Sequence, residues 1–393
     1  MKRFDVVTVG RSDWGIWRPV LRRLSEESNV RVRLLVGGAH LLRGHGHGLA
    51  DIEGSDFGEV LPVPMSVECD SPLDVATTIG RGVAAFAACF AAHRPDLVLV
   101  LGDRYEMFAA AVAAVPFVLP IAHLHGGERT GGAIDDVMRH AMTKMSHLHY
   151  VSAEAHAQRV RQMGEEPWRV VVAGAPALDE LLRLPSVTDT ELSEQVGLDV
   201  SAPFALCTFH PTTLEPGSAH GQAQALLHAL DDVGIPVVFT MPNADTGGQV
   251  IRGLIATALS THPRWRAHES LGHHRYGALL ARAAVVVGNS SSGIIEAPTF
   301  RVPVVNIGER QSGRVRAFNV VDVTADRAAI AAAMVAALKP EFREGISTMS
   351  SPFGDGHASE RIVASLMKTL FDERLLKKDF VDTAGDRGTS NAA

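Results

Sequence analysis

Residues 97–128, LVLVLGDRYEMFAAAVAAVPFVLPIAHLHGGE, contain two apolar runs that each end abruptly in glycine, histidine and charge. Short apolar runs bounded in this way are typical of strands buried in a parallel sheet. Ligands of open α/β sheets bind beyond the carboxyl ends of the strands. We therefore expect one crevice to receive the ionisable side chains that follow the two runs: Asp103, Arg104, His123, His125 and Glu128.

The same alternation of apolar strand and amphipathic helix extends along most of the chain, with one looser stretch at 174–186. It predicts an α/β protein with two Rossmann-like, doubly wound parallel-sheet domains. We expect an N-terminal domain over 1–180, completed by a C-terminal helix at 357–371, and a C-terminal domain over 181–356. Residues 373–393 are charged and then small and polar, which predicts a flexible tail.

The composition excludes several classes of protein. With 393 residues, 46% hydrophobic and 21% charged, the chain has the make-up of a globular protein of about two domains. The net charge of −7 and the lack of a basic stretch argue against a nucleic-acid partner. The longest uncharged run, 108–124, is interrupted by two prolines and is shorter than the ~20 residues of a membrane span. Three cysteines without pair spacing fit a reducing compartment, so we expect a cytoplasmic protein.

The second half carries a motif suited to an anionic ligand. Residues 288–293, GNSSSG, follow an apolar strand and open a helix, which places hydroxyls and free amides at a helix N-terminus. Glu296 lies four residues after Ser292, on the same helix face, where a carboxylate could accept hydrogen bonds from a ribose diol. Arg310, after the next strand, could balance a diphosphate charge. The pattern predicts a nucleotide diphosphate site.

The first half carries the acids. Asp103, Glu128, Asp135, Asp136 and His125 gather near its strand ends, and Arg11 stands in the first strand–helix turn, where a guanidinium suits phosphate. Asp135 and Arg139 are four residues apart on one helix face. Two carboxylates near one carbon suit general acid/base chemistry. We expect a nucleotide-activated substrate to lie in a central cleft between the domains.

Three other functions use parts of this pattern. The pair His123-x-His125 occurs in metal-dependent hydrolases, but Ser290 follows Asn289 where such an enzyme needs a histidine, so the set of metal ligands is incomplete. A glycosyltransferase of the same two-domain architecture binds the same class of nucleotide sugar. A non-catalytic sugar-nucleotide sensor would have no need of acids clustered at the sugar end.

The chain resembles the hydrolysing UDP-N-acetylglucosamine 2-epimerases of sialic-acid and related nonulosonic-acid biosynthesis. The resemblance covers residues 7–316 and rests on GRSDWG, LGDRYEMFAAA, HLHGGERTGGAIDDVMRHAMTK, HPTTLE, PNAD, GNSSSGIIEAP and GERQSGR. The non-hydrolysing epimerases typically read HVEAGLRT where this chain has HLHGGERT, and they lack the IDD element. The animal enzymes carry a glutamate at the place of His125, which leaves the second acid/base role to His125 or Glu128.

The resemblance implies the two-domain architecture of B-type glycosyltransferases, a homodimer or homotetramer, and a bipartite site. It assigns the UDP moiety to Arg11, Arg104, His210, Asn243, Ser290, Ser291, Glu296 and Arg310. It places Asp103, His125 or Glu128, Asp135 and Asp136 around the sugar, with Arg139 on the substrate side supporting Asp135.

The implied reaction needs neither a nicotinamide nor a metal. The C2 proton and UDP leave to give a glycal, water adds at C1, and a proton returns to C2 from the opposite face. The products are UDP and N-acetylmannosamine. UDP-N,N′-diacetylbacillosamine is the alternative substrate, and it differs from UDP-N-acetylglucosamine at C4 and C6. Loops 40–48 and 65–71 are the expected contacts to those positions.

Overall fold

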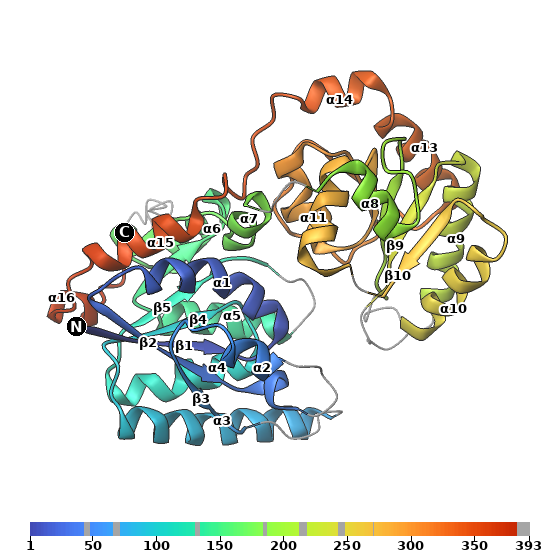
Figure 1. The fold of residues 1–393 in the computed structure, drawn as a ribbon. Helices are drawn as coiled ribbons and strands as arrows, with labels where there is room; N and C mark the ends of the chain where they lie inside the picture. Colours follow the sequence, from blue (N-terminus) through green and yellow to red (C-terminus); the bar gives the residue numbers. More distant parts are fainter. Residues whose placement is uncertain are drawn as a thin grey trace, which may run out of the picture. The chain divides into compact units, whose positions relative to one another are not determined.

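The computed structural model describes residues 1–42, 48–65, 71–129, 134–183, 187–211, 218–242, 248–269 and 271–382. The chain forms two compact units (Figure 1). The first contains residues 1–129 and 133–179 together with 356–393, and the second contains residues 180–355. The chain therefore returns to its first unit at the C-terminal end.

The N-terminal unit is built on a seven-stranded parallel sheet in the order β3-β2-β1-β4-β5-β6-β7. Its strands are β1 Lys2–Thr8, β2 Val30–Val36, β3 Glu59–Pro62, β4 Leu97–Leu101, β5 Ile121–Leu124, β6 Leu148–Val151 and β7 Val170–Val172. Its helices are α1 Arg11–Ser25, α2 Gly48–Glu53, α3 Pro72–Ala92, α4 Tyr105–Ala114, α5 Ile134–Met145 and α6 Glu154–Gln162. Short 3₁₀ segments are Gly38–Leu41, Val115–Phe117 and Pro167–Arg169.

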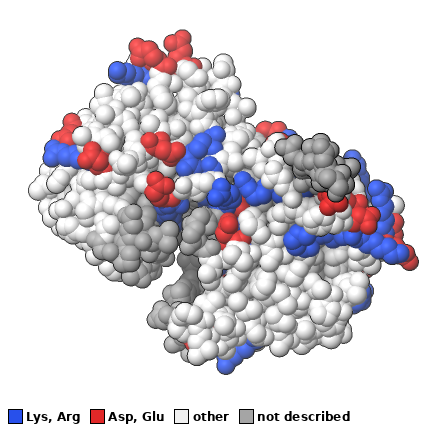
Figure 2. Space-filling model, turned by 180° about the vertical axis from the view of Figure 1, so that it is seen from behind, with Lys and Arg blue, Asp and Glu red and all other residues white. Residues whose placement is uncertain are grey.

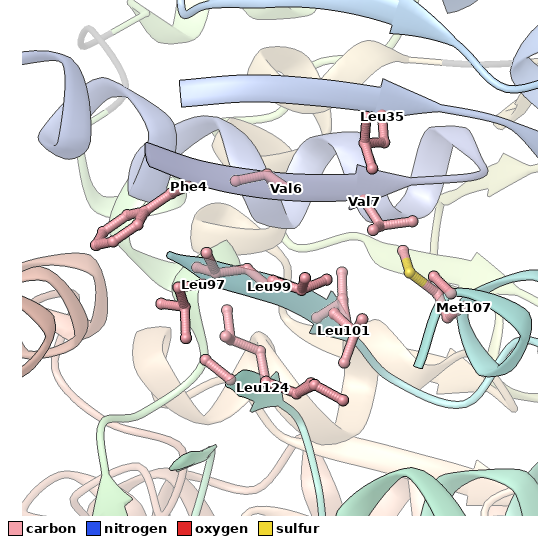
Figure 3. Close-up of a cluster of buried hydrophobic side chains, with 14 of the residues drawn as sticks. Phe4, Val6, Val7, Leu35, Leu97, Leu99, Leu101, Met107 and Leu124 are labelled. Carbon is pink, nitrogen blue, oxygen red and sulfur yellow. The ribbon is translucent and has the colours of Figure 1, made fainter. Parts of the chain in front are cut away.

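The core of this unit explains why its central strands read as continuous apolar runs. All residues of β4 and β5 are buried, because helices cover both faces of a parallel sheet. In Figure 3, side chains from β1, β4 and β5, among them Phe4, Leu99 and Leu124, point toward one another in a single cluster. This packing, with the strand register, sets where the carboxyl ends of neighbouring strands lie relative to one another.

Helix α3 is, among the described residues, the one helix that is long and apolar enough to cross a membrane by length and composition alone. It begins with a capping box, in which Ser71 and Asp74 each accept a hydrogen bond from the other's backbone N–H. It packs on α4 and buries Gly82, Phe86 and Phe90. Its place between β3 and β4 is that of a crossover helix in a parallel α/β sheet.

The C-terminal segment differs from the flexible tail expected from residue 373. Helix α15 Ala358–Lys368 packs on α1, and α16 Glu373–Leu376 follows it. The buried Arg169 donates to the carbonyls of Leu375 (2.8 Å) and Lys377 (2.7 Å). Lys378 pairs with the buried Glu165 at 2.8 Å. These contacts order residues up to 382, and the sequence did not reveal them because their partners lie about 200 residues earlier.

The C-terminal unit is built on a six-stranded parallel sheet in the order β10-β9-β8-β11-β12-β13. Its strands are β8 Ala205–Thr208, β9 Val237–Thr240, β10 Trp265–His268, β11 Val285–Gly288, β12 Val304–Ile307 and β13 Val320–Val323. Its helices are α8 Asp189–Val196, α9 Ala219–Val233, α10 Gly248–Leu259, α11 Gly272–Arg282, α12 Ser291–Ile295, α13 Arg327–Ala337 and α14 Pro340–Ile346, with a 3₁₀ segment at Ala297–Phe300. Helix α7 Pro176–Leu182 spans the boundary between the units.

Both sheets have the doubly wound topology predicted from the sequence. The strand order reverses between β1 and β4 in the first sheet and between β8 and β11 in the second. At such switch points the connections diverge to opposite faces and leave a crevice beyond the strand ends. The expected site residues follow these strands and their neighbours.

The distribution of surface charge can be followed on one face of the molecule. On the face drawn in Figure 2, basic and acidic side chains lie near one another, and no broad basic area is visible.

Glu165 provides a test of the C-terminal anchor. Burial alone would raise the pKa of its carboxyl, but hydrogen bonds from His149, Lys144 and Lys378 lower it to about 2. This stabilisation is present above about pH 4.5, the ordinary pKa of the group, and is lost as the pH falls toward 2. We expect Glu165→Gln to lower the free energy of unfolding by about 3 kcal/mol at pH 7 and by less at pH 3.5.

Urea unfolding at the two pH values measures this difference. The control is Glu53→Gln, which changes an exposed carboxyl at the end of α2 and should alter stability little at either pH. Equal stability of the Glu165→Gln variant and wild type at pH 7 would show that the network does not hold the C-terminal segment.

Candidate active site and nucleotide-binding residues

Three adjacent strands of the N-terminal sheet bring the acid/base residues together. Strands β4, β5 and β6 are paired in that order, and their carboxyl ends are followed by Asp103, His125 and Ser152. The left-handed Gly102 (φ 71°) turns the chain directly after β4, and its N–H donates to the carbonyl of Leu124. Parallel pairing therefore places Asp103 beside the turn that carries His125.

Arg139 of α5 connects the two turns. Its guanidinium donates to the carbonyl of His125 (2.8 Å) and to the carboxylate of Asp103, and it lies 3.7 Å from the Glu128 carboxylate. The residue is 4% exposed. The resemblance placed Arg139 on the substrate side in support of Asp135; in the structure it forms its ion pair with Asp103 and faces protein groups.

His125 and Glu128 form one hydrogen-bonded pair. Nδ1 of His125 lies 2.6 Å from Oε1 of Glu128, and both side chains are almost buried. Nε2 of His125 is buried and has no hydrogen-bond partner within the described part of the chain. The sequence left open which of the two acts, and the structure shows that they are a unit.

The backbone of this turn is strained. His125 has φ 60°, a left-handed conformation that is uncommon for residues with a side chain. Gly127 follows at φ 75°, and a Cβ at this position would meet the carbonyl oxygen of His156 at 2.5 Å. Only glycine fits there, which explains the second glycine of HLHGGE.

Two residues behind this pair were not predicted from the sequence. The hydroxyl of Ser152 donates to Oε1 of Glu128 (2.7 Å) and lies 3.0 Å from Nδ1 of the buried His156. Burial alone would raise the pKa of the Glu128 carboxyl, but His125 and Arg139 lower it well below its usual value. Glu128 is therefore a carboxylate in the folded protein.

The two aspartates at the start of α5 have different surroundings. Burial, and then the charge of Asp103, raise the pKa of Asp135, so these two carboxyl groups lie in one cluster. Asp136 lies 3.6 Å from His140, one turn along the helix. The charge of Asp103 thus acts on Asp135, whereas Asp136 pairs with a neighbour on its own helix.

His123 has a structural role. Its Nε2 lies 2.8 Å from the carbonyl of Gly102, its Nδ1 lies 3.3 Å from the Thr143 hydroxyl, and burial lowers its pKa to about 3. Within the described ranges, no group of three or more His, Cys, Asp or Glu side chains is arranged to hold a metal ion.

Two predicted arginines stand at the β1–β4 switch point. Arg11 begins α1, and its side chain lies outside the described part of the structure. Arg104 precedes α4 and is held by the buried Glu106 through two hydrogen bonds of 3.1 and 3.3 Å. The side chain of Arg104 is 39% exposed, so part of its guanidinium is open to a ligand.

In the C-terminal unit, Asn289 fixes the ends of β8 and β11. Its side-chain amide accepts from the N–H of His210 (2.7 Å) and donates to the carbonyl of His210 (2.8 Å). The Asn289 carbonyl accepts from Arg310 (3.0 Å) and Gln311 (2.8 Å). The structure therefore brings the predicted His210, Ser290 and Arg310 to one edge of the sheet. Asn243, predicted after β9, lies outside the described residues.

The GNSSSG motif forms a hydroxyl cluster. Ser290 caps α12 by accepting from the N–H of Ser292, and the Ser292 hydroxyl donates to Ser290 (3.1 Å) and contacts the hydroxyl of Tyr276. Ser291 begins the helix and is half-buried. Tyr276 and Asn289 were not predicted as site residues. Tyr276 lies on another helix, α11, and the partners of the buried Asn289 amide are distant in the sequence, so only the folded structure shows these contacts.

Glu296 is the unusual group of this unit. Burial raises the pKa of its carboxyl to about 7. Its carboxylate accepts no hydrogen bond from any residue that the structure describes. A half-buried carboxyl without donors is suited to accept hydrogen bonds from a ligand.

Comparison with known proteins identifies the family. The family model described as UDP-N-acetylglucosamine 2-epimerase matches residues 22–367. The chain therefore belongs to the hydrolysing UDP-N-acetylglucosamine 2-epimerase family, which confirms the resemblance seen in its motifs.

Two relatives and one solved structure show how far the likeness extends. The UDP-N,N′-diacetylbacillosamine 2-epimerase (hydrolyzing) of Legionella pneumophila is 36% identical over 94% of this chain and 96% of its own length. The polysialic acid biosynthesis protein P7 of Escherichia coli is 32% identical over 97% and 98%. The UDP-GlcNAc 2-epimerase of Neisseria meningitidis bound to UDP-GlcNAc has the same fold, with a TM-score of 0.80, 19% identity and coverage of 94% and 100%.

The raised pKa of Glu296 predicts a pH-dependent cost to stability. A carboxyl whose folded pKa exceeds its unfolded value of 4.5 contributes fully below pH 4.5, and that contribution is lost as the pH rises through about 7. At pH 8 we expect Glu296→Gln to have a free energy of unfolding about 2 kcal/mol greater than wild type, and therefore to unfold at a higher temperature. At pH 4.5 the two proteins should unfold at the same temperature.

Differential scanning calorimetry at the two pH values makes the comparison. Glu309→Gln, an exposed neighbour beyond β12, is the matched control and should show no such dependence. A Glu296→Gln variant that is less stable than wild type at pH 8 would mean that the carboxylate already has a partner in the unliganded protein.

Proposed function

We propose that this protein is a hydrolysing 2-epimerase that converts a UDP-2-acetamido sugar into UDP and the free 2-epimeric sugar. The observation that carries the proposal is the buried Nε2 of His125, which has no hydrogen-bond partner among the described residues, together with the Asp103–Arg139 ion pair next to its turn. A base next to positioned carboxylates can act in general acid/base catalysis, which removes a carbon-bound proton and returns one. Family membership supports the same reaction class.

The C-terminal unit supplies the nucleotide-binding groups in this proposal. Ser290, Ser291 and Arg310 would contact the diphosphate, and Glu296 would accept hydrogen bonds from the ribose hydroxyls. His210 and Asn243 would complete the UDP site from the ends of β8 and β9. Arg11 and Arg104 complete the set of residues proposed to bind the UDP moiety.

The first chemical step is an elimination. Nε2 of His125 takes the C2 proton, the electron pair of that bond forms the C1–C2 double bond, and the C1–O bond breaks with its electrons on the departing UDP. Arginines near the diphosphate stabilise the charge that develops there. The intermediate is a glycal, and no electron is lost or gained by the protein.

The second step is a hydration. Water adds its oxygen to C1 and loses a proton, while C2 receives a proton from the face opposite to the one that lost it. The Asp103–Asp135 pair suits this delivery, because burial and the charge of Asp103 raise the pKa of Asp135 and so help it to retain a proton. Asp103 itself forms an ion pair with Arg139. Asp136 borders this cluster and pairs with His140.

For the substrate, the Legionella relative favours UDP-N,N′-diacetylbacillosamine, because it is 36% identical over nearly the whole chain. UDP-N-acetylglucosamine, leading to N-acetylmannosamine and sialic acid, is the second candidate and is supported by the relative named for polysialic acid biosynthesis. The predicted contacts to C4 and C6, loops 40–48 and 65–71, lie largely outside the described residues.

Incubation of the protein with each UDP sugar in deuterated water tests the proposal. We expect release of UDP and of a mannose-configured 2-acetamido sugar that carries deuterium at C2, with faster turnover of the bacillosamine derivative. Transfer of the sugar to an added acceptor would indicate a glycosyltransferase. Binding without turnover of either compound would indicate a sensor, and both outcomes contradict the proposal.

Asp103→Asn should abolish most of the turnover while UDP affinity stays within a few-fold of wild type. The variant keeps the shape of the side chain but loses the charge that pairs with Arg139 and contributes to the raised pKa of Asp135, so we expect kcat to fall by about 10²–10⁴-fold. Steady-state kinetics and UDP titration measure the two effects.

Asp96→Asn, at the amino end of β4, is the matched control because it changes an exposed carboxylate that accepts from the N–H of Arg3 (2.7 Å). It should leave kcat near wild type. Full activity of the Asp103→Asn variant would remove Asp103 from the chemistry.

A further inference from the structure

A chain of hydrogen bonds continues behind the His125–Glu128 pair, away from Asp103. It runs from His125 to Glu128 (2.6 Å), from Glu128 to Ser152 (2.7 Å) and from Ser152 to His156 (3.0 Å). Ser152 and His156 are 1% and 3% exposed. Their strand end and helix are held against the turn by Arg159, which donates to the carbonyl of Gly127.

The protons of this chain can be assigned by counting donors. A carboxylate only accepts hydrogen bonds, so both His125 and Ser152 must donate to Oε1 of Glu128. Ser152 has one proton and gives it to Glu128, so it must accept from Nδ1–H of His156. Neutral His125 then carries its proton on Nδ1, and Nε2 presents a lone pair.

We propose that Ser152 and His156 are positioning residues that maintain Glu128 as a proton acceptor and thereby hold His125 in the tautomer whose Nε2 is free to take the substrate proton. The inference rests on the proposed function for its consequence in catalysis. The tautomer itself is a property of the folded protein.

The other titratable and charged groups around the His125–Glu128 pair either favour the charged form of Glu128 or are themselves uncharged or paired. Arg139 of α5 lies 3.7 Å from Glu128 and favours its charged form. His123 of β5 and His156 of α6 have pKa values lowered by burial to about 3 and about 4, so neither is charged near neutral pH. Asp103, after β4, has its charge balanced by Arg139.

Removal of the Ser152 hydroxyl takes away a hydrogen bond that favours the charged form of Glu128. The pKa of Glu128 must then rise, and a protonated Glu128 can donate to Nδ1 of His125, which moves the imidazole proton to Nε2. The acidic limb of the pH–rate profile should therefore shift to higher pH in Ser152→Ala, by about one unit.

The test compares Ser152→Ala with Ser152→Thr, which keeps the hydroxyl, and with Ser146→Ala as a control. Ser146 is equally buried, and its hydroxyl donates to the carbonyl of Met142 (2.7 Å), remote from the Glu128 carboxylate. We expect kcat at pH 7 to fall about tenfold in Ser152→Ala with KM within twofold, to recover in Ser152→Thr, and to remain unchanged in the control.

A second readout does not depend on activity. In the ¹⁵N spectrum of the histidine rings, assigned with His125→Gln, wild type near neutral pH should show a protonated Nδ1 and a bare Nε2 at His125, and in Ser152→Ala the protonation of Nε2 should begin at a higher pH than in wild type. Bare Nε2 in wild type together with the shifted profile supports the inference. A wild-type His125 protonated on Nε2, or a folded Ser152→Ala variant with unchanged spectrum and profile, overturns it. If neither UDP sugar is turned over by wild type, the proposed function fails, and the spectrum alone decides the tautomer.

Discussion

The guanidinium of Arg139 joins the ends of two neighbouring strands. It bonds the carboxylate of Asp103 after β4 and the backbone carbonyl of His125 after β5. His125 is in a left-handed conformation, which costs energy and persists only where the surroundings require it. The buried Arg139, the glycine turn and the Glu128 carboxylate together hold this conformation, so contacts within the protein set the orientation of the His125 imidazole.

The two units differ in how their ionisable site residues are hydrogen-bonded and paired. In the N-terminal unit, charges are paired: Asp103 with Arg139, and Glu128 with its donors, so its groups are fixed and their proton states defined. In the C-terminal unit, the half-buried Glu296 carboxyl accepts no hydrogen bond from the residues that the structure describes, and burial raises its pKa. A site that is poorly satisfied alone and well satisfied with ligand is a common compromise between stability and function.

The central strands could be predicted from the sequence because a strand that is buried on both faces consists of consecutive apolar residues, as in 97–101. The edge strands β3, β10 and β13 were not predicted from the sequence. Their residues, EVLP, WRAH and VVDV, are largely half-exposed, so these strands lack the continuous apolar run of a strand buried on both faces. Site residues at strand ends, such as Asp103 and Ser290, were predictable from position. Ser152, His156 and Asn289 were not, because their importance comes from partners that only the folded chain brings near.

Arg139 holds the turn at 125–128 in its left-handed conformation. Hydrogen–deuterium exchange of Arg139→Met, compared with wild type, tests this role, because the amides of that turn report the constraint without any substrate. We expect faster exchange across residues 125–129, with β4 and β5 protected as in wild type. Unchanged protection of that turn in the variant would contradict it.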